Sequence, residues 1–315
     1  MRIKFWGVRG SVPSPLVSED VQYKIGKILR KAVQEKVDSR EKIDSFLNNL
    51  SEFSYGTVGG NTSCIEVDAD DKIFIFDMGS GMRNFGQHLQ DTNNFKNQTF
   101  YIFLTHTHWD HISGFPFFYP AFFPQNKLVL HSTIPDFKER LEIQQDSKFF
   151  PVSMDSMHSE KEFVKLEYSS SINYNNAEIS NLRLHHPGGS FAYRLRCKDE
   201  TFVYATDSEF RNLSDTFILN FSNFCHQADA LVIDAQYTFE EAAQKEDWGH
   251  SSALAGINIA ADAGVKRIFL FHHDPNRNDE DLNAVYKKAV NYHRMNYPQS
   301  DLEIHLAREG MEIKI

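Results

Sequence analysis

The chain has 315 residues, of which 41% are hydrophobic and 24% are charged, a composition typical of a folded globular protein with a sizeable core. The formal net charge of −10 at pH 7 argues against a broad nucleic-acid surface, because phosphate binding needs a local excess of Lys and Arg. No run approaches the roughly 18 apolar residues of a membrane span, and the N-terminus enters strand-like sequence without an apolar signal segment. We therefore expect a cytoplasmic protein with no membrane partner.

The first part of the chain changes from strand-like to helical sequence. A strand is predicted over residues 2–8, followed by a turn at 9–13. Apolar residues then recur at helical spacing in two runs within residues 19–53, which predicts a helical hairpin inserted between strands. Asp38, with Glu41 three residues later, is interpreted as the N-cap of the second helix. The charges of this insertion balance, so a solvated surface is one interpretation, and a lid or a dimer contact is the alternative.

The next strands lead to a dense cluster of metal-ligand residue types. Strands are predicted over 62–67 and 72–76, followed by the loop 77–81, a helix over 82–88 and a buried strand over 100–104. The cluster Thr105-His106-Thr107-His108-Trp109-Asp110-His111 comes directly after this strand. Side chains alternate on an extended strand end, so His106 and His108 point the same way, while Asp110 and His111 can face a second ion. Imidazole and carboxylate are ligands of Zn²⁺ and related metals, and the density makes a histidine-rich loop by chance a poor alternative.

Several later segments repeat the pattern of a strand end or helix start that carries a histidine or a carboxylate. The aromatic segment 114–124 is interpreted either as a core-packing loop or as an apolar wall beside the site, and a helix is predicted over 134–144. Residues 149–184 carry mixed strand signals that the sequence does not order. Beyond them, the ligand-type residues are His185 and His186 before a strand, Asp207 and Glu209 after a strand, His250 near a helix start, and His272 and His273 after a strand. These positions fit sheets whose edges converge on one site.

The ordered series resembles the metallo-β-lactamase fold superfamily of metal-dependent hydrolases. Residues 105–111 match its HxHxDH signature, and the intervals to His186, Asp207 and His272 match the rest of its ligand series. Within the superfamily, the chain is most similar to the phosphodiesterase branch of tRNase Z, PhnP-type and cyclic-nucleotide phosphodiesterases, through segments 6–11, 60–63, 76–81, 186–194, 250–252 and 270–272. The resemblance implies one α/β hydrolase domain over residues 1–315, a four-layer αβ/βα sandwich that carries the helical insertion at 19–53 near its N-terminus.

The resemblance also implies a two-metal site. The first ion is expected on His106, His108 and His186, the second on Asp110, His111 and His272, and Asp207 is expected to bridge both. His185 and His273 are the competing neighbours at the two paired positions, and Asp77 is expected to be structural. Two divalent ions are implied; zinc is favoured, and manganese or iron also fits this ligand set.

The implied reaction is hydrolysis of a phosphodiester by a hydroxide that bridges the two metals. His250 is expected to hydrogen-bond the phosphoryl oxygen or protonate the leaving group. Asp110 is expected to assist the nucleophile, and Glu209 to fix His250 by a hydrogen bond.

A small cyclic nucleotide or dinucleotide is the expected substrate. The chain lacks the Gly-rich basic arm with which tRNase Z enzymes grip tRNA, and its acidic balance disfavours an extended nucleic acid. Arg9, Asn61, Arg194 and His273 are the candidate substrate-binding residues, and a homodimer is a further possibility. The alternatives are an RNA-processing nuclease, a thioesterase or β-lactam hydrolase on the same fold, and a degenerate metal- or nucleotide-binding protein without activity.

Overall fold

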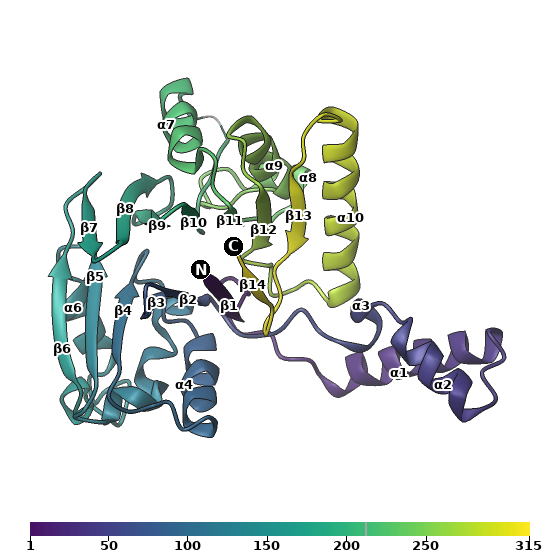
Figure 1. Cartoon of the computed structure of the whole chain (residues 1–315), viewed down its shortest axis with the longest axis horizontal. Helices are drawn as coiled ribbons and strands as arrows, with labels where there is room; N and C mark the ends of the chain where they lie inside the picture. The colour runs from purple at the N-terminus through teal and green to yellow at the C-terminus, as the bar shows by residue number, and fades with distance from the viewer. Residues whose placement is uncertain (212) are drawn as a thin grey trace.

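The computed structural model describes residues 1–211 and 213–315, and these form two mixed β-sheets of seven strands each (Figure 1). In the first sheet the strands β1 to β3 and β14 pair antiparallel, while β3 to β6 run parallel. Its order is β14 (Glu312–Lys314), β1 (Arg2–Gly7), β2 (Cys64–Ala69), β3 (Lys72–Phe76), β4 (Thr99–Phe103), β5 (Lys127–Ser132) and β6 (Glu160–Lys165). The expected strands over 2–8, 62–67, 72–76 and 100–104 all lie here.

The second sheet is built by the C-terminal half of the chain. Strands β7 to β10 pair antiparallel, while β10 to β13 run parallel. Its order is β13 (Glu303–Leu306), β12 (Arg267–Phe271), β11 (Ala230–Asp234), β10 (Glu200–Ala205), β9 (Ser190–Cys197), β8 (Ala177–Leu184) and β7 (Ser171–Tyr174). Strand β8 alternates between buried and more exposed residues, whereas β11 is buried along its whole length and reads as a continuous apolar run before Asp234.

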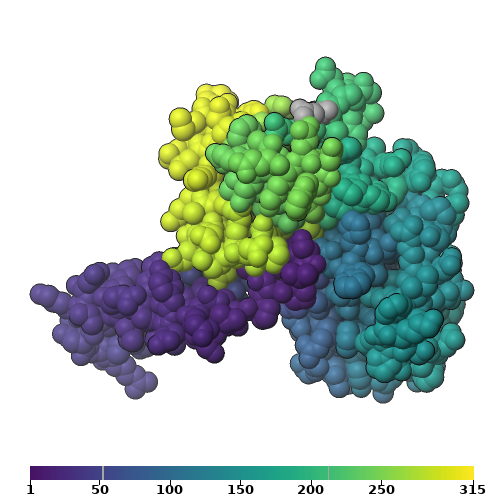
Figure 2. All heavy atoms as spheres, turned by 180° about the vertical axis from the view of Figure 1, so that it is seen from behind, coloured from purple at the N-terminus to yellow at the C-terminus, as the bar shows by residue number. Residues whose placement is uncertain are grey.

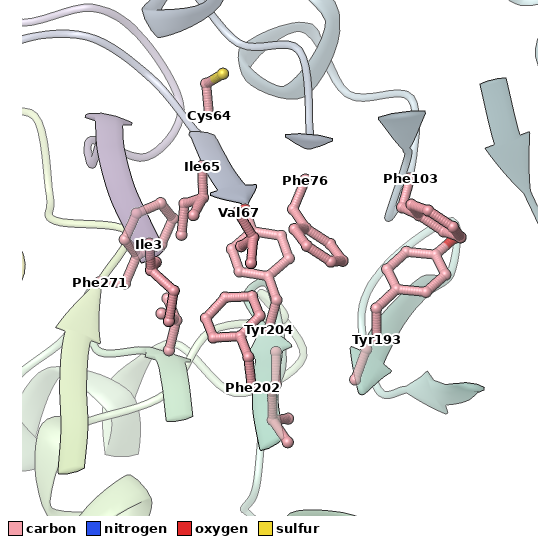
Figure 3. Close-up of a cluster of buried hydrophobic side chains, with 14 of the residues drawn as sticks. Ile3, Cys64, Ile65, Val67, Phe76, Phe103, Tyr193, Phe202, Tyr204 and Phe271 are labelled. Atoms are coloured by element: carbon pink, nitrogen blue, oxygen red, sulfur yellow. The ribbon is translucent and has the colours of Figure 1, made fainter. Parts of the chain in front are cut away.

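The inner faces of the two sheets meet in an aromatic core (Figure 3). Phe76 of β3 packs edge-on against Phe202 of β10 with ring centroids 5.4 Å apart, and Phe103 of β4 packs against Tyr193 of β9 at the same distance. Burying each such ring stabilises the fold by roughly 1.5–3 kcal/mol. This contact fixes the ends of the strands of one sheet relative to those of the other.

Helices cover the outer faces. Helix α4 (Gly81–Asp91) buries Met82, Phe85 and Leu89 on the first sheet at helical spacing, and α9 (Ala253–Asp262) packs on β11 and β12 of the second. The resulting order of helices, sheet, sheet and helices is the predicted four-layer sandwich (Figure 1). The other body helices are α5 (Trp109–Ile112), α6 (Phe137–Gln144), α7 (Asp215–Cys225), α8 (Phe239–Gln244) and α10 (Asp279–Asn296), with the 3₁₀ turns η1 (Phe115–Phe117), η2 (Tyr119–Phe122) and η3 (Met154–Ser156).

Two predicted helix starts are shifted in the structure. Helix α6 begins at Phe137 and not at residue 134, because Pro135 restricts the residue before it to extended backbone. The second helix of the insertion, α2 (Arg40–Asn48), is capped by Ser39 and not by Asp38: the Ser39 side chain accepts a 3.3 Å hydrogen bond from the Lys42 amide. Asp38 instead forms an ion pair with the Lys42 side chain at 2.7 Å.

Residues 18–55, which we call the arm, leave the body between β1 and β2. They form α1 (Ser18–Gln34), α2 and the short α3 (Glu52–Tyr55). The two views show the arm in purple, extending away from the two sheets (Figures 1 and 2). Within the described residues, none of the helices combines the length and apolar character needed to cross a membrane. All three cysteines are buried and unpaired.

Candidate metal centre

The loop after β4 is held by one buried carboxylate, Asp77, at the end of β3. Its oxygens accept hydrogen bonds from the Thr105 amide at 2.8 Å and the Thr105 hydroxyl at 2.9 and 3.0 Å. Nδ1 of His111 lies 2.7 Å from the same carboxylate, and the Tyr204 hydroxyl donates to it from the second sheet at 2.9 Å. Asp77 is fully buried and therefore orients the histidine loop; it does not point into the site.

The first ligand group joins two residues of this loop to one residue of the second sheet. Nε2 of His106 lies 2.9 Å from Nδ1 of His108, and Nε2 of His186 lies 3.1 Å from the same Nδ1. His186 follows β8, and its other nitrogen, Nδ1, lies 2.9 Å from the carbonyl oxygen of Gly249. The neighbouring His185 points elsewhere, with its Nε2 3.9 Å from the exposed carboxylate of Asp247.

The second group contains Asp110, His111, Asp207 and His272, all buried. Oδ2 of Asp110 lies 3.2 Å from Nε2 of His111 and 3.1 Å from Nε2 of His272. Oδ2 of Asp207 lies 3.1 Å and 3.2 Å from the same two nitrogens. His273, the neighbour of His272, is directed away from the group, and its Nε2 lies 2.9 Å from the carbonyl oxygen of Ala307.

Asp207 lies between the two groups. While its Oδ2 faces the second group, its Oδ1 lies 3.8 Å from Nε2 of His106 and 3.7 Å from Nε2 of His186 in the first. Burial opposes its ionisation, but the imidazoles of His111 and His272 hold the pKa of Asp207 well below its usual range. One ionised carboxylate therefore presents one oxygen to each group.

Left-handed backbone places three of these side chains. Asp77, Asp207 and His272 have φ of 61°, 55° and 58°, each in the residues just after a strand of the first or second sheet. Such conformations cost about 1–3 kcal/mol each for residues other than glycine. Two glycines make room for the imidazoles: a Cβ on Gly10 would lie 2.4 Å from the His272 ring, and one on Gly249 would lie 2.3 Å from Nδ1 of His186.

The donor set fits divalent cations. Histidine nitrogens and carboxylate oxygens are their common ligands, and in each group the ligand atoms all lie within 4.8 Å of one another. Nε2 of His111 is buried and has no well-oriented hydrogen bond within the described part of the chain, although two carboxylate oxygens lie close to it. Burial also lowers the pKa of His106 well below its usual range, which keeps that imidazole neutral and its lone pair free.

His250 lies beside both groups, and Asp234 holds it there. Nδ1 of His250 lies 2.7 Å from Oδ2 of Asp234, the last residue of β11, and its ring centroid lies 5.2 Å from that of His186 and 4.9 Å from that of His272. Burial disfavours its charge, but the Asp234 carboxylate raises the pKa of His250 to about 9.

Glu209 does not have the expected contact with His250. Its two oxygens accept hydrogen bonds from the backbone amides of Asp247 and Gly249, at 3.3 and 3.1 Å. It therefore shapes the loop that precedes His250, and Asp234 makes the side-chain contact that the sequence had suggested for Glu209. Two residues beside the site were not among the sequence predictions. Asp234 ends an apolar run in the same way as Asp207. Gln236 has its Oε1 3.0 Å from Nδ1 of His272.

The four candidate substrate-binding residues are engaged in structural contacts. Arg9 is only 3% exposed and donates to the carbonyl oxygens of Gly59, Asp274 and Arg277. Asn61 donates to Glu309 and accepts a hydrogen bond from the Ser80 hydroxyl.

Arg194 and His273 are similarly occupied. Arg194 donates to the carbonyl oxygens of Phe224 and His226, at the end of α7. His273 is fully enclosed, and burial lowers its pKa to about 3. The sequence singled out these side chains as polar groups, and in the structure their hydrogen bonds join distant segments of the chain.

The match to a known family agrees with this geometry. A family model described as the Beta-lactamase superfamily domain matches residues 75–273, more than half of the chain, and this range contains all seven side chains of the two groups. The chain belongs to this superfamily, and the predicted metallo-β-lactamase fold is confirmed.

Its relatives include the kinds of enzyme that the sequence resembled. The chain is 26% identical over 307 residues to ribonuclease Z of Picrophilus torridus, covering 82% of this chain and 91% of that protein. The fold is similar to that of unliganded yeast PDE1 (TM-score 0.64, 13% identity, 100% of this chain and 99% of that one) and of the short form of human tRNase Z (0.61, 15%, 100% and 99%). A diphosphatase from the PhnP family is a further structural neighbour (0.59, 16%, 100% and 97%). The predicted resemblance to a hydrolase of this kind is therefore confirmed.

Proposed function

We propose that the protein is a two-metal phosphodiesterase that hydrolyses a small nucleotide diester. The observation that carries this proposal is Asp207, which presents one carboxylate oxygen to each of two ligand groups. Such a shared ligand is suited to two ions held close together, the arrangement used to hydrolyse phosphate esters.

The ligands follow the two groups. His106, His108 and His186 would hold one ion, Asp110, His111 and His272 the other, with Asp207 shared. When bound, such ions supply activation of water and neutralisation of the charge that develops on phosphoryl oxygens. Zinc suits this set of nitrogen and oxygen ligands, and manganese and iron suit it as well. Oδ2 of Asp110 also accepts a 2.7 Å hydrogen bond from the Ser11 amide, which fixes its direction.

His250 is the proposed hydrogen-bond donor to the phosphoryl or leaving-group oxygen. With Nδ1 fixed by Asp234, its Nε2 is left available for the substrate, on the side of the ring that no described hydrogen bond uses. Asp234 is then a positioning residue, because it acts through His250. Glu209 supports the same histidine more remotely, through the backbone of residues 247–249.

A cavity beside His250 supports a nucleotide as the substrate. It has a volume of about 280 Å³ and is lined mainly by apolar side chains, including Phe210, Phe239, Ala242, Ala243 and Ala255, with Arg211 also among its lining residues. A phosphodiester held at His250 would place one planar base beside the rings of Phe210 and Phe239. The volume of this cavity is small for a larger ligand.

The first experiment measures metal content and diester hydrolysis together. The full chain, loaded with Zn²⁺ or Mn²⁺, should bind two ions and hydrolyse bis-p-nitrophenyl phosphate. It should prefer the p-nitrophenyl ester of thymidine 5′-monophosphate to methyl p-nitrophenyl phosphate, which lacks a base. Two bound ions without hydrolysis of any diester would contradict the proposed activity.

Filling the cavity tests the base site separately. Ala243→Leu should remove the preference for the base-bearing ester by roughly ten-fold or more in kcat/KM while leaving methyl p-nitrophenyl phosphate almost unchanged. Met295→Ala, at an exposed apolar residue outside the cavity, is the matched control. Equal losses on both esters would contradict a base in this cavity.

An RNA-processing nuclease is the second candidate, and the likeness to ribonuclease Z of Picrophilus torridus favours it. The chain's charge of −10 and the balanced charge of the arm weigh against a long polyanion. Precursor tRNA with a 3′ extension and cyclic mono- and dinucleotides, compared under one metal condition, separate the two. A kcat/KM for the RNA at least a hundred-fold above that for the small diesters would replace our proposal.

The remaining alternatives have simpler tests. Hydrolysis of a thioester or a β-lactam in preference to every diester would assign another bond to the same site. A degenerate binding protein would bind ions or nucleotides and hydrolyse none of these substrates.

A further inference from the structure

The metal centre opens to solvent on the side of His108. All residues of the second ligand group are buried, whereas in the first group His106 is buried and His108 is exposed. The loop after β8 leaves room at this point. A Cβ on Gly188 would lie 3.7 Å from Nε2 of His108, and one on Gly189 would have no contact within 4 Å among the described residues beyond its chain neighbours. We call the space around His108, Gly188 and Gly189 the mouth.

Two of the three tryptophans of the chain lie at this opening. Trp109 and Trp248 are 83% and 62% exposed, whereas the third is only 9% exposed. Trp109 follows His108 directly, so their Cα atoms lie about 3.8 Å apart. Trp248 precedes Gly249, whose carbonyl oxygen lies 2.9 Å from Nδ1 of His186. Because tryptophan is highly buried on average, two exposed indoles at one opening indicate a surface for a flat ligand.

The two indoles differ in what already covers them. Nζ of Lys245 lies over the Trp248 ring, 5.6 Å from its centroid. No ring or cation of the described residues lies over the Trp109 ring. The backbone of Trp109 is nevertheless fixed, because its carbonyl oxygen accepts a 2.8 Å hydrogen bond from the Ser113 amide. Trp109 therefore offers both faces of an aromatic ring from a fixed position beside the metal centre.

Trp109 and the apolar cavity lie at opposite ends of a row of histidines. Nδ1 of His108 lies 3.1 Å from Nε2 of His186, and the ring centroid of His186 lies 5.2 Å from that of His250. The row begins beside Trp109, in the loop of the first sheet, and ends at the cavity, whose lining residues all belong to the C-terminal half of the chain. A phosphodiester bound over this row would direct one substituent toward each end.

We propose that the substrate is a dinucleotide, with one base in the cavity beside His250 and the other stacked on Trp109. This inference rests on the proposed function and narrows it. A cyclic mononucleotide has a single base and would leave one of the two aromatic surfaces unused. Stacking on a tryptophan suits any base, since every base has a π face, so Trp109 selects for the presence of a second base and not for its identity.

A longer single strand would also stack its bases on tryptophan. Such strands are held mainly by Lys and Arg side chains along successive phosphates, and a chain with a formal net charge of −10 is poorly suited to that task. The cavity and Trp109 together account for two bases. A dinucleotide is therefore the occupant that fits both the aromatic surfaces and the charge.

Hydrolysis of two thymidine diesters by the metal-loaded chain tests the proposal. Thymidylyl-thymidine carries two bases, and the methyl ester of thymidine 5′-monophosphate carries one. In each, the oxygen of water bonds to phosphorus, the bond to the leaving oxygen breaks, and that oxygen takes up a proton. The products are thymidine monophosphate and either thymidine or methanol, and chromatography of the nucleosides and nucleotides measures both reactions. The wild-type chain should have a higher kcat/KM for the two-base diester, by about ten-fold or more.

Substitutions of Trp109 measure how much of this preference comes from the indole. Trp109→Ala should lower the preference by about five-fold to a hundred-fold, because the second base loses its stacking surface. Trp109→Phe keeps an aromatic ring and should keep most of the preference. Metal analysis should find two ions in both variants, which separates lost stacking from damage to the neighbouring ligands. Tyr55→Ala, at an exposed aromatic residue of the arm, is the matched control and should keep the full preference.

An unchanged preference in Trp109→Ala, or equal losses on both diesters with both ions retained, would overturn the proposal. A wild-type chain that hydrolysed neither diester would contradict the proposed function, and fluorescence then decides the base site. Thymidylyl-thymidine should quench the tryptophan emission of the wild type more strongly than that of Trp109→Phe. Equal quenching in the two chains would count against the proposal, and the same titration decides if Trp109→Ala loses an ion.

Discussion

The two sheets contribute to the metal centre in different ways. The first sheet supplies four ligand-type residues from one loop, within residues 106–111, and the Asp77 carboxylate anchors this loop through Thr105 and His111. The second sheet supplies one residue at a time: His186 after β8, Asp207 after β10, Asp234 at the end of β11 and His272 after β12. A contiguous ligand motif can be recognised in the sequence, whereas a dispersed set exists only because parallel strands end at the same edge of a sheet.

The largest expected effect comes from the residue that serves both groups. Asp207→Ala should lose both ions and reduce hydrolysis of bis-p-nitrophenyl phosphate by at least about a thousand-fold, because metal activation supplies several kcal/mol. Metal analysis by mass spectrometry and the diester assay measure the two losses. Asp247→Ala, at an exposed carboxylate, is the control, and a variant at Asp207 that kept two ions would refute the shared ligand.

The next test asks whether the sheets or the ligand groups are the functional units. His108 belongs to the first sheet and His186 to the second, but their nitrogens lie 3.1 Å apart in one group. His108→Ala and His186→Ala should therefore each retain about one ion per chain and lose activity to a similar extent, about a hundred-fold or more. Metal titration followed by calorimetry measures this. If the two variants lost different ions, His108 and His186 would not belong to one ligand group.

His250 and Asp234 should matter for turnover more than for metal content. His250→Ala should lower kcat by about a hundred-fold to a thousand-fold with two ions retained, because a hydrogen-bond or proton donor is lost. Asp234→Asn should cost about ten-fold to a hundred-fold, because it acts through His250.

Glu209→Gln is the matched comparison for Asp234→Asn, since Glu209 contacts only the backbone of the same loop. It should lower kcat less than Asp234→Asn does. The reverse order would return the positioning role to Glu209.

The last test leaves catalysis aside and concerns the contact between the sheets. His131 of β5 is fully buried, with Nδ1 3.0 Å from the carbonyl oxygen of Ile102 and Nε2 2.5 Å from the hydroxyl of Tyr174 in β7. Burial lowers the pKa of His131 to about 4, so this imidazole stays neutral in the native chain above that pH. In an unfolded chain the same imidazole takes up a proton below about pH 6.5. The free energy of unfolding should therefore fall between pH 6.5 and 4, by an amount on the order of 3 kcal/mol from this residue.

Urea unfolding at a series of pH values measures this dependence. In His131→Gln, which keeps hydrogen-bonding groups but does not titrate, the slope between pH 6.5 and 4 should be smaller. Replacement of the exposed His158 by Asn is the control and should leave the slope as it is. An unchanged slope in the Gln variant would show that other groups cause the acid sensitivity.

Local signals were sufficient for many of the strands and for the histidine loop, whereas the fold class was implied by the resemblance to a known superfamily. The alternating and continuous apolar runs predicted strands such as β4, and the residue spacing of 105–111 predicted a metal site from seven consecutive residues. The substrate-binding candidates show what local signals leave out. Arg9 and Arg194 were selected as polar groups, but only the tertiary structure shows that carbonyl oxygens of distant segments accept hydrogen bonds from them.

The sequence by itself determined the strands that lead into the histidine loop, the two helical runs of the arm and the identity of the residues able to bind metal, because each of these depends on neighbours within a few positions. It did not order the strands within residues 149–184. The tertiary structure alone decided that Asp234, and not Glu209, contacts His250. The choice of His186 and His272 over their neighbours was implied by the family resemblance, and the structure directs these two side chains to the ligand groups. It also decided that the apolar row of α1 stays uncovered by the body. These outcomes depend on how strand ends from both sheets meet and on left-handed residues such as Asp207 and His272, and neither can be computed from a short stretch of sequence.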